Sequence, residues 1–297
     1  MDNPRQILED IKPTKYFFIG IDSDGCVFDT MEIKQKECFC PNYIKHYNLQ
    51  KVSKYARETW EFVNLYSTTR GVNRFKALLR AFELLAERPE IAARNAQLMD
   101  LTPLKEWVEK ETKLGNPALE KYAAEVNNEI IDLTYQWSID VNKMISDMVY
   151  DIPPFPFFRE SIDKMNTKAD LMVISQTPVE ALSREWEEHG INGYVKLIAG
   201  QEYGTKAEHL KYGAKGKYED GKILMIGDAP GDLKAAKSND VLFYPINPGH
   251  EEKSWERFYK EAIDKFFEGT YAGEYEEKVI KEFEDYLPEN PSWERIK

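Results

Sequence analysis

Short apolar runs recur along the chain, and small or polar residues follow each of them. The first run, Phe17–Ile21, contains only apolar residues and one glycine, which is typical of a strand buried on both faces. Similar runs lie at 170–175, 222–227 and 241–246, with a weaker one at 194–200. Helix-like segments separate the runs, and one of them ends at a helix-stopping Gly190. This alternation predicts an α/β fold with a parallel sheet built from right-handed crossover units.

Residues 31–150 have a different pattern, with no convincing alternation of apolar and polar positions. Apolar residues at 75, 78, 79, 82 and 85 fall on one helical face, and residues 119–150 carry another long helical pattern. A proline-rich connector, 151–158, closes the segment. We therefore expect a discontinuous sheet domain, residues 1–30 and 151–297, interrupted by an all-helical domain, residues 31–150. Amphipathic helices are expected after residue 250, within the sheet domain, and the pattern assigns them no function.

Charge and composition narrow the partners. The 297 residues include 40 Lys and Arg against 52 Asp and Glu, which gives a net charge of −12. A chain this acidic is not expected to bind nucleic acid or a membrane, and it needs local cations or a metal to bind an anion. Without a secretory-type start or a membrane-length apolar run, we expect a cytoplasmic location. The three cysteines, Cys26, Cys38 and Cys40, are too few and too close for a disulfide framework, and we interpret them as structural.

Polar side chains gather where the expected strands end. These residues are Asp22 and Asp24 after the first strand, Ser175 and Gln176 after the second, and Asp228 and Asp232 after the fourth. Lys206 lies between the runs at 170–175 and 222–227, where a helix could begin. Ligands bind at the carboxyl ends of parallel strands, so these groups are expected to meet there.

These groups suit phosphoryl transfer. A carboxylate such as Asp22 can attack phosphorus and form an aspartyl-phosphate intermediate. Asp22 and Asp228 can hold Mg²⁺, a cation that prefers oxygen ligands, while Lys206 neutralises phosphate oxygens and Ser175 donates a hydrogen bond. Asp24 is then available to protonate the leaving oxygen and to deprotonate the attacking water.

The motifs together resemble those of the haloacid dehalogenase-like (HAD) superfamily of hydrolases. "DSDGC" resembles its first motif, "LMVIS" its second and "GDAPGD" its fourth, with Lys206 as the lone lysine of the third. The resemblance implies a Rossmann-like core under a helical cap. It further implies Asp22 as nucleophile, Asp24 as acid/base, and Mg²⁺ held by Asp22, the Asp24 backbone carbonyl and Asp228, with Asp232 as a further ligand. The second aspartate argues against a dehalogenase. Cys26 departs from the family's usual Thr or Val.

The resemblance also implies that substrate choice depends on the helical domain. Residues 68–82, "TTRGVNRFKALLRAF", resemble the specificity loop and following helix of sugar-phosphate mutases. Arg70 and Arg74 would then contact a second anionic group, with Gln176 as a further substrate contact; the alternative is that both arginines are solvated helix-end charges. We expect a Mg²⁺-dependent phosphatase acting on a small phosphorylated metabolite. A sugar phosphomutase on the same core and a catalytically silent binding module remain the alternatives.

Overall fold

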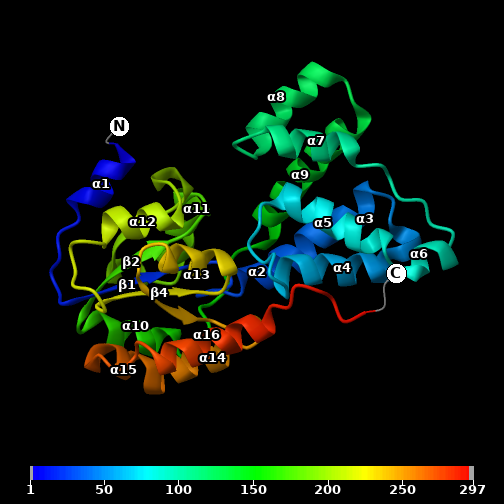
Figure 1. The fold of residues 1–297 in the computed structure, drawn as a ribbon. Helices are drawn as coiled ribbons and strands as arrows, with labels where there is room; N and C mark the ends of the chain where they lie inside the picture. The colour runs from blue at the N-terminus through cyan, green and yellow to red at the C-terminus, as the bar shows by residue number, and fades with distance from the viewer. Residues whose placement is uncertain (1–2, 294–297) are drawn as a thin grey trace. The chain divides into compact units, whose positions relative to one another are not determined.

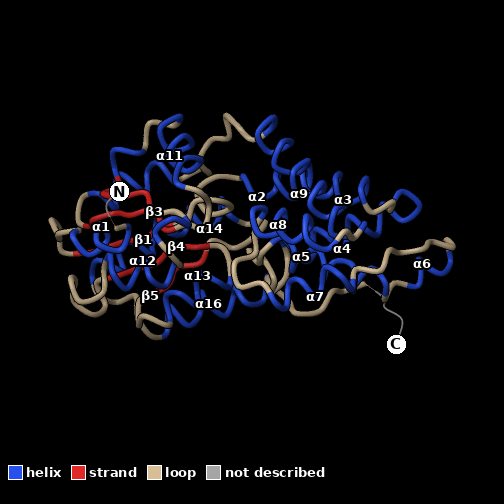
Figure 2. Tube along the Cα trace, turned by 90° about the horizontal axis from the view of Figure 1, so that it is seen from above, coloured by secondary structure: helices blue, strands red, loops and turns tan. Residues whose placement is uncertain are grey.

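The computed structural model describes residues 3–293, which fold as two compact units. The sheet unit comprises Met1–Met31 and Asp151–Leu287, and the helical unit comprises Glu32–Tyr150 and the chain from Pro288 on. The second unit is therefore an insertion between the first strand of the sheet and the rest of it. Figure 2 shows strands in the sheet unit only.

The sheet unit contains a five-stranded sheet in which every paired neighbour is parallel, in the order β3-β2-β1-β4-β5. This confirms the α/β fold class. The strands are β1 (Phe17–Ile21), β2 (Ala169–Ile174), β3 (Val195–Ala199), β4 (Ile223–Gly227) and β5 (Leu242–Pro245). All five expected strands are thus present, including the weaker candidate, which forms β3 at the edge. The first strand of the chain is the central strand of the sheet.

Two layers of helices enclose the sheet (Figure 1). Alternate residues of β1 explain why: Ile19 and Ile21 enter one apolar cluster, and Phe18 enters another on the opposite face. The first cluster includes residues of α10 (Phe158–Asn166), α11 (Val179–Glu188), α14 (Glu251–Arg257) and α15 (Ile263–Glu268). The second includes residues of α1 (Pro4–Asp10), α12 (Lys206–Gly213) and α13 (Pro230–Lys237). Helix α16 (Glu274–Tyr286) contributes to both.

The helices after residue 250 complete the first of these layers. Trp255 of α14 and Phe266 of α15 are fully buried against the sheet, and a π-helical turn at Phe258–Ala262 connects the two helices. The expected amphipathic helices are therefore present, and their apolar faces form part of the main core rather than an appendage to it.

The helical unit contains no strand within residues 32–150. Its core gathers large aromatic side chains, among them the fully buried Trp60 and Trp137. One expectation is wrong in detail: the helical pattern over 119–150 is two helices, because Asn127 adopts a left-handed conformation at φ 41° and Asn128 caps the next helix. The helices are α2 (Thr30–Ile33, which spans the boundary), α3 (Cys40–His46), α4 (Ser53–Leu65), α5 (Arg74–Ala86), α6 (Pro89–Ala93), α7 (Thr102–Lys110), α8 (Asn116–Val126) and α9 (Glu129–Met148).

The end of the chain differs from the expected domain boundary. Residues 288–293, expected within the sheet domain, group with the helical unit. Pro288 accepts a hydrogen bond from the Thr68 amide, and the Trp293 ring meets Phe62 edge-on at 5.2 Å. The Arg88 guanidinium lies over the same indole at 4.9 Å. An amphipathic pattern cannot reveal this docking, because the contacts come from Pro288 and Trp293, which lie beyond α16.

None of the helices within residues 3–293 combines the length and the apolar character that crossing a membrane would require.

Candidate active site

The carboxyl ends of the two central strands bring the predicted aspartates together. Asp22 directly follows β1 and its amide donates to the Ile226 carbonyl of β4, while Asp228 directly follows β4. Asp232 lies in the first turn of α13. The side chains of Asp22, Asp228 and Asp232 are all buried, and each offers a carboxylate oxygen within 4.8 Å of the others. Carboxylates this close repel one another unless a cation lies among them.

Gly227 makes this approach possible. A Cβ atom at Gly227 would meet the Asp232 side chain at 2.5 Å, a distance that atoms in contact do not reach. Asp232 is held in that position because its Oδ2 accepts the Ala229 amide at 3.1 Å, at the open amino end of α13. The glycine before Asp228 therefore makes room for the third carboxylate of the cluster.

Lys206 supplies the local cation that an acidic chain needs. It is the first residue of α12, as expected, and Thr205 caps this helix in a reciprocal arrangement with Glu208. The Nζ atom lies 2.8 Å from Asp22 Oδ2 and 2.5 Å from Asp232 Oδ1. Burial on its own lowers the pKa of Lys206, but the attraction of Asp22 and Asp232 outweighs it, so the pKa is raised and the lysine is charged.

The pKa of Asp22 is also displaced. Burial raises the pKa of Asp22 well above its usual value, and the charges of Asp232 and Asp228 raise it further, against the attraction of Lys206. Three carboxylates with one ammonium leave an excess of negative charge in a buried place. The cluster is therefore electrostatically incomplete without a further cation.

Asp24 is held by two hydroxyl groups. Thr30 Oγ1 donates to its Oδ1 at 2.6 Å, and Thr177 Oγ1 donates to its Oδ2 at 2.7 Å. The turn between Asp24 and the helical insertion is tight, with Gly25 at φ 74°, a conformation that favours glycine. The Asp24 side chain is outside the carboxylate cluster, so its expected metal contact through the backbone carbonyl stays a prediction.

The second strand delivers its polar residues to the same edge. Ser175 is buried at the tip of β2, and its Oγ accepts the Thr177 amide at 3.2 Å. Gln176 donates through Nε2 to the Gly204 carbonyl at 2.9 Å, just before the start of α12. Gln176 thus ties the tip of β2 to the loop that leads to Lys206, and its substrate contact stays a prediction.

Arg70 and Arg74 lie in the helical unit, and their guanidinium groups contact protein atoms. Arg70 is buried and donates to the Leu65 carbonyl at 3.1 Å. Arg74 donates to Ser138 Oγ at 3.0 Å and to Asn142 Oδ1 at 2.7 Å. Burial lowers the pKa of Arg74 to about 10, and these partners are neutral. The alternative of solvated helix-end charges is therefore wrong for Arg70, whereas the expected anion contacts stay predictions.

Sequence reasoning missed Thr30, Thr177 and Gly227. Neither threonine belongs to a motif that links it to Asp24, from which Thr30 lies 6 residues away and Thr177 153 residues away. The glycine was visible within "GDAPGD", but its effect on Asp232 depends on how closely the helix approaches the strand. All three cysteines are free and buried, as expected of structural residues.

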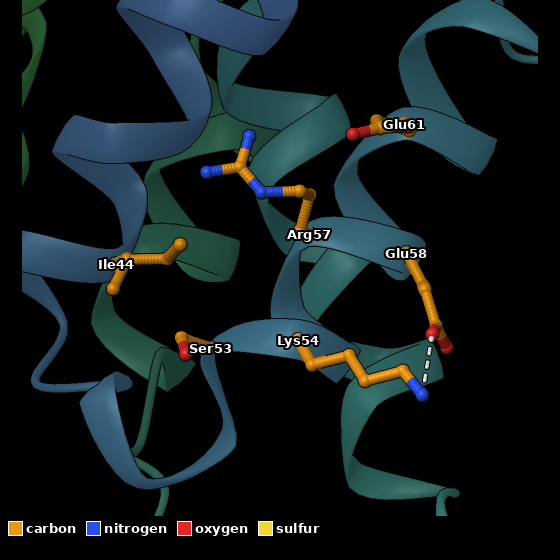
Figure 3. A pocket seen from close by; sticks show the side chains of 6 residues that line it. All are labelled: Ile44, Ser53, Lys54, Arg57, Glu58 and Glu61. Carbon is orange, nitrogen blue, oxygen red and sulfur yellow. Dashed lines mark ion pairs between the residues drawn. The ribbon is translucent and has the colours of Figure 1, made fainter.

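A surface pocket of about 430 Å³ lies elsewhere, between α3 and α4 of the helical unit (Figure 3). Lys54 and Glu58 on its wall form an ion pair along α4, at 4.0 Å. None of the predicted site residues is among the six that line it.

The chain is thus an α/β protein with a parallel sheet, a carboxylate cluster at the ends of its central strands, and a helical insertion after the first strand. No family model matches the sequence, and no curated protein matches it.

Among solved structures, similar folds include a haloacid dehalogenase-like family hydrolase from Streptococcus pneumoniae, with 12% identity, 84% of this chain and 92% of the other covered, and a TM-score of 0.44. One from Xanthomonas campestris has 11% identity, coverage of 89% and 98%, and a TM-score of 0.44. A HAD-superfamily hydrolase from Geobacter sulfurreducens has 14% identity, coverage of 79% and 90%, and a TM-score of 0.40. These values are low, so the activity proposed below rests on the side chains of this chain.

Proposed function

We propose that the protein is a Mg²⁺-dependent phosphomonoester hydrolase that acts on a small phosphorylated metabolite through an aspartyl-phosphate at Asp22. The observation that carries this proposal is the buried cluster of Asp22, Asp228 and Asp232, with Lys206 in contact with two of them. A phosphatase that uses a carboxylate nucleophile needs this combination, because two anions must approach each other before they react.

The donor set fits Mg²⁺. It consists of carboxylate oxygens only, within 4.8 Å of one another. The positive charge of Lys206 does not balance the negative charge of the three carboxylates. Mg²⁺ binds through a few carboxylates together with water and substrate phosphate. We therefore assign Asp22, Asp228 and Asp232 as its protein ligands, together with the Asp24 carbonyl. When bound, the ion would neutralise charge between Asp22 and the phosphoryl group.

The residues of the chain then divide the reaction between them. A carboxylate oxygen of Asp22 attacks phosphorus while the bond from phosphorus to the substrate oxygen breaks. Asp24 gives its proton to that leaving oxygen and later takes one from the water that hydrolyses the aspartyl-phosphate. Lys206 and Ser175 bind phosphoryl oxygens, and Thr30 and Thr177 orient Asp24 between the two steps.

The test is phosphate release from a panel of small phosphorylated metabolites, with Mg²⁺ and with a chelator, for the wild-type protein and for Asp22→Asn. We expect release that depends on Mg²⁺ and that falls at least about 10³-fold in Asp22→Asn, because the amide is not a nucleophile. Asp170→Asn is the matched control, since Asp170 is an equally buried carboxylate that holds Thr14 and Tyr218 instead. It is expected to lose stability while turnover by the folded protein persists.

Substantial release by Asp22→Asn would contradict the nucleophile assignment, and release that survives the chelator would contradict the metal. If wild-type protein releases no phosphate from any compound but becomes phosphorylated at Asp22, the phosphomutase is favoured instead.

A further inference from the structure

Two tryptophans donate hydrogen bonds to the loop that follows β1 and carries Asp22 and Asp24. The Trp186 indole N–H donates to Ser23 Oγ at 3.0 Å, and the Trp255 indole N–H donates to the Cys26 carbonyl at 2.7 Å. Both tryptophans are fully buried, so water does not compete for either hydrogen bond. Ser23 stands between the two aspartates, and its Oγ in turn lies 3.1 Å from Glu185 Oε2.

The two rings share one neighbour, Phe158. Trp186 meets the Phe158 ring edge-on with centroids 6.1 Å apart, and Trp255 meets it edge-on at 5.0 Å. The three side chains come from α11, α14 and α10, three helices that are distant in sequence. Packed aromatic rings have few alternative arrangements, so the direction of both N–H groups is determined by this packing. We call Trp186, Phe158 and Trp255 the aromatic cradle.

The loop itself is a compact turn with little freedom. The Ser23 carbonyl accepts the amides of Cys26, Val27 and Phe28 at 3.3, 2.9 and 3.2 Å. The Val27 carbonyl accepts the amide of Phe155, from the connector that returns from the helical insertion, at 2.8 Å. The cradle therefore holds a turn whose other end is bonded to the returning chain.

We propose that Trp186 and Trp255 are positioning residues that hold the catalytic loop, residues 22–28, in its reactive geometry. Trp255 gives the helices after residue 250 a role in catalysis, because α14 reaches the loop through this side chain. Asp22 and Asp24 sit on this loop, and a small displacement of reacting groups has a large effect on rate. One of the two readouts of this proposal, the change in kcat, rests on the proposed hydrolase function, whereas the other, hydrogen exchange, does not.

The experiment compares Trp186→Phe, Trp255→Phe and Ser23→Ala with Tyr271→Phe in the full chain. Ser23→Ala removes the acceptor of Trp186, together with the Ser23 bond to Glu185, and leaves the Trp186 ring, so it separates hydrogen bonding from packing. Tyr271→Phe is the matched control, because it removes another fully buried hydrogen bond of the C-terminal region, from the Tyr271 hydroxyl to the Phe243 carbonyl, away from the loop. All four are compared at a temperature where each is folded.

We expect kcat to fall about tenfold in each of the three loop variants, with KM changed less than about twofold, while Tyr271→Phe keeps both. Hydrogen exchange supplies the second readout: the amides of Cys26, Val27 and Phe28 should exchange at least about tenfold faster in the loop variants than in Tyr271→Phe. A role in stability alone would change these four proteins alike.

The outcomes separate the two proposals. If wild-type protein proves to have no phosphatase activity but exchange at 26–28 accelerates in the loop variants only, positioning stands and the hydrolase fails. If exchange and kcat are unchanged in the loop variants, or Tyr271→Phe changes both equally, positioning is overturned.

Discussion

Two pairs of buried polar groups in the helical unit contrast with the carboxylate cluster of the sheet unit. Each pair in the helical unit is complete in itself: Trp60 donates to Gln35 at 3.0 Å, and Tyr47 hydrogen-bonds Thr134 at 2.9 Å. In the sheet unit, three buried carboxylates face one another with one lysine between two of them. The first arrangement is complete in the protein alone, whereas the second is costly until a cation and an anionic substrate join it.

The two arrangements have opposite effects on the stability of the fold. A complete network adds to folding and specifies one packing of the helices. A cluster of like charges subtracts from folding, and proteins retain such clusters where chemistry requires them. The changes considered next displace a carboxylate of the cluster, alter its protonation, or remove a charged side chain of the helical unit.

After Asp22→Asn, the largest effect is expected from Gly227→Ala. The new methyl group would displace Asp232 from the cluster, and we expect kcat/KM to fall at least about 10²-fold and the Mg²⁺ concentration for half-maximal activity to rise. Gly231→Ala is the matched control, because a Cβ at Gly231, in the first turn of α13, meets nothing within 4 Å. Equal activities in the two variants would show that Asp232 is dispensable.

The next effect concerns stability and pH in the absence of metal. Because the folded protein holds the pKa of Asp22 above its usual 3.8, the folded state binds the proton more tightly than the unfolded state does. The free energy of unfolding should therefore fall by about 1.4 kcal/mol for each pH unit between the two pKa values as pH rises. Urea unfolding from pH 4 to pH 8, with chelator, measures this loss.

Two comparisons make the pH experiment specific to Asp22. The loss should be absent in Asp22→Asn, which has no proton to release, and Mg²⁺ should reduce it in the wild-type protein because the ion binds the charged form. A loss of the same size in Asp22→Asn would assign the effect to other groups.

The smallest effect is expected in the helical unit, from Arg74→Met. If Arg74 contacts an anionic group of the substrate, as predicted, KM should rise about fivefold with kcat unchanged. The variant loses a positive charge that attracts the substrate but keeps every reacting group. Arg80→Met, on the same helix but paired with Glu83 at 3.2 Å, is the control. Unchanged kinetics in Arg74→Met would show that Arg74 serves only to hydrogen-bond Ser138 and Asn142.

Local patterns predicted much of the fold because they record burial directly. The run at Phe17–Ile21 has no polar side chain, and it is buried along its whole length in the centre of the sheet. The periodicity around Phe75 likewise predicted α5. The pattern failed where one residue decides the outcome, as at Asn127, whose left-handed backbone divides the expected long helix.

The order of polar residues along the chain was enough to nominate Asp22, Asp24, Ser175, Lys206, Asp228 and Asp232, because parallel strands bring their carboxyl ends to one edge. The sequence by itself therefore determined the fold class and the chemistry of the groups at that edge. Only the tertiary structure decided how those groups are held: the space that Gly227 leaves for Asp232, the hydroxyls on Asp24, and the indoles under the loop. These depend on contacts between residues up to 229 positions apart, which no local pattern records because burial, not spacing, brings them together.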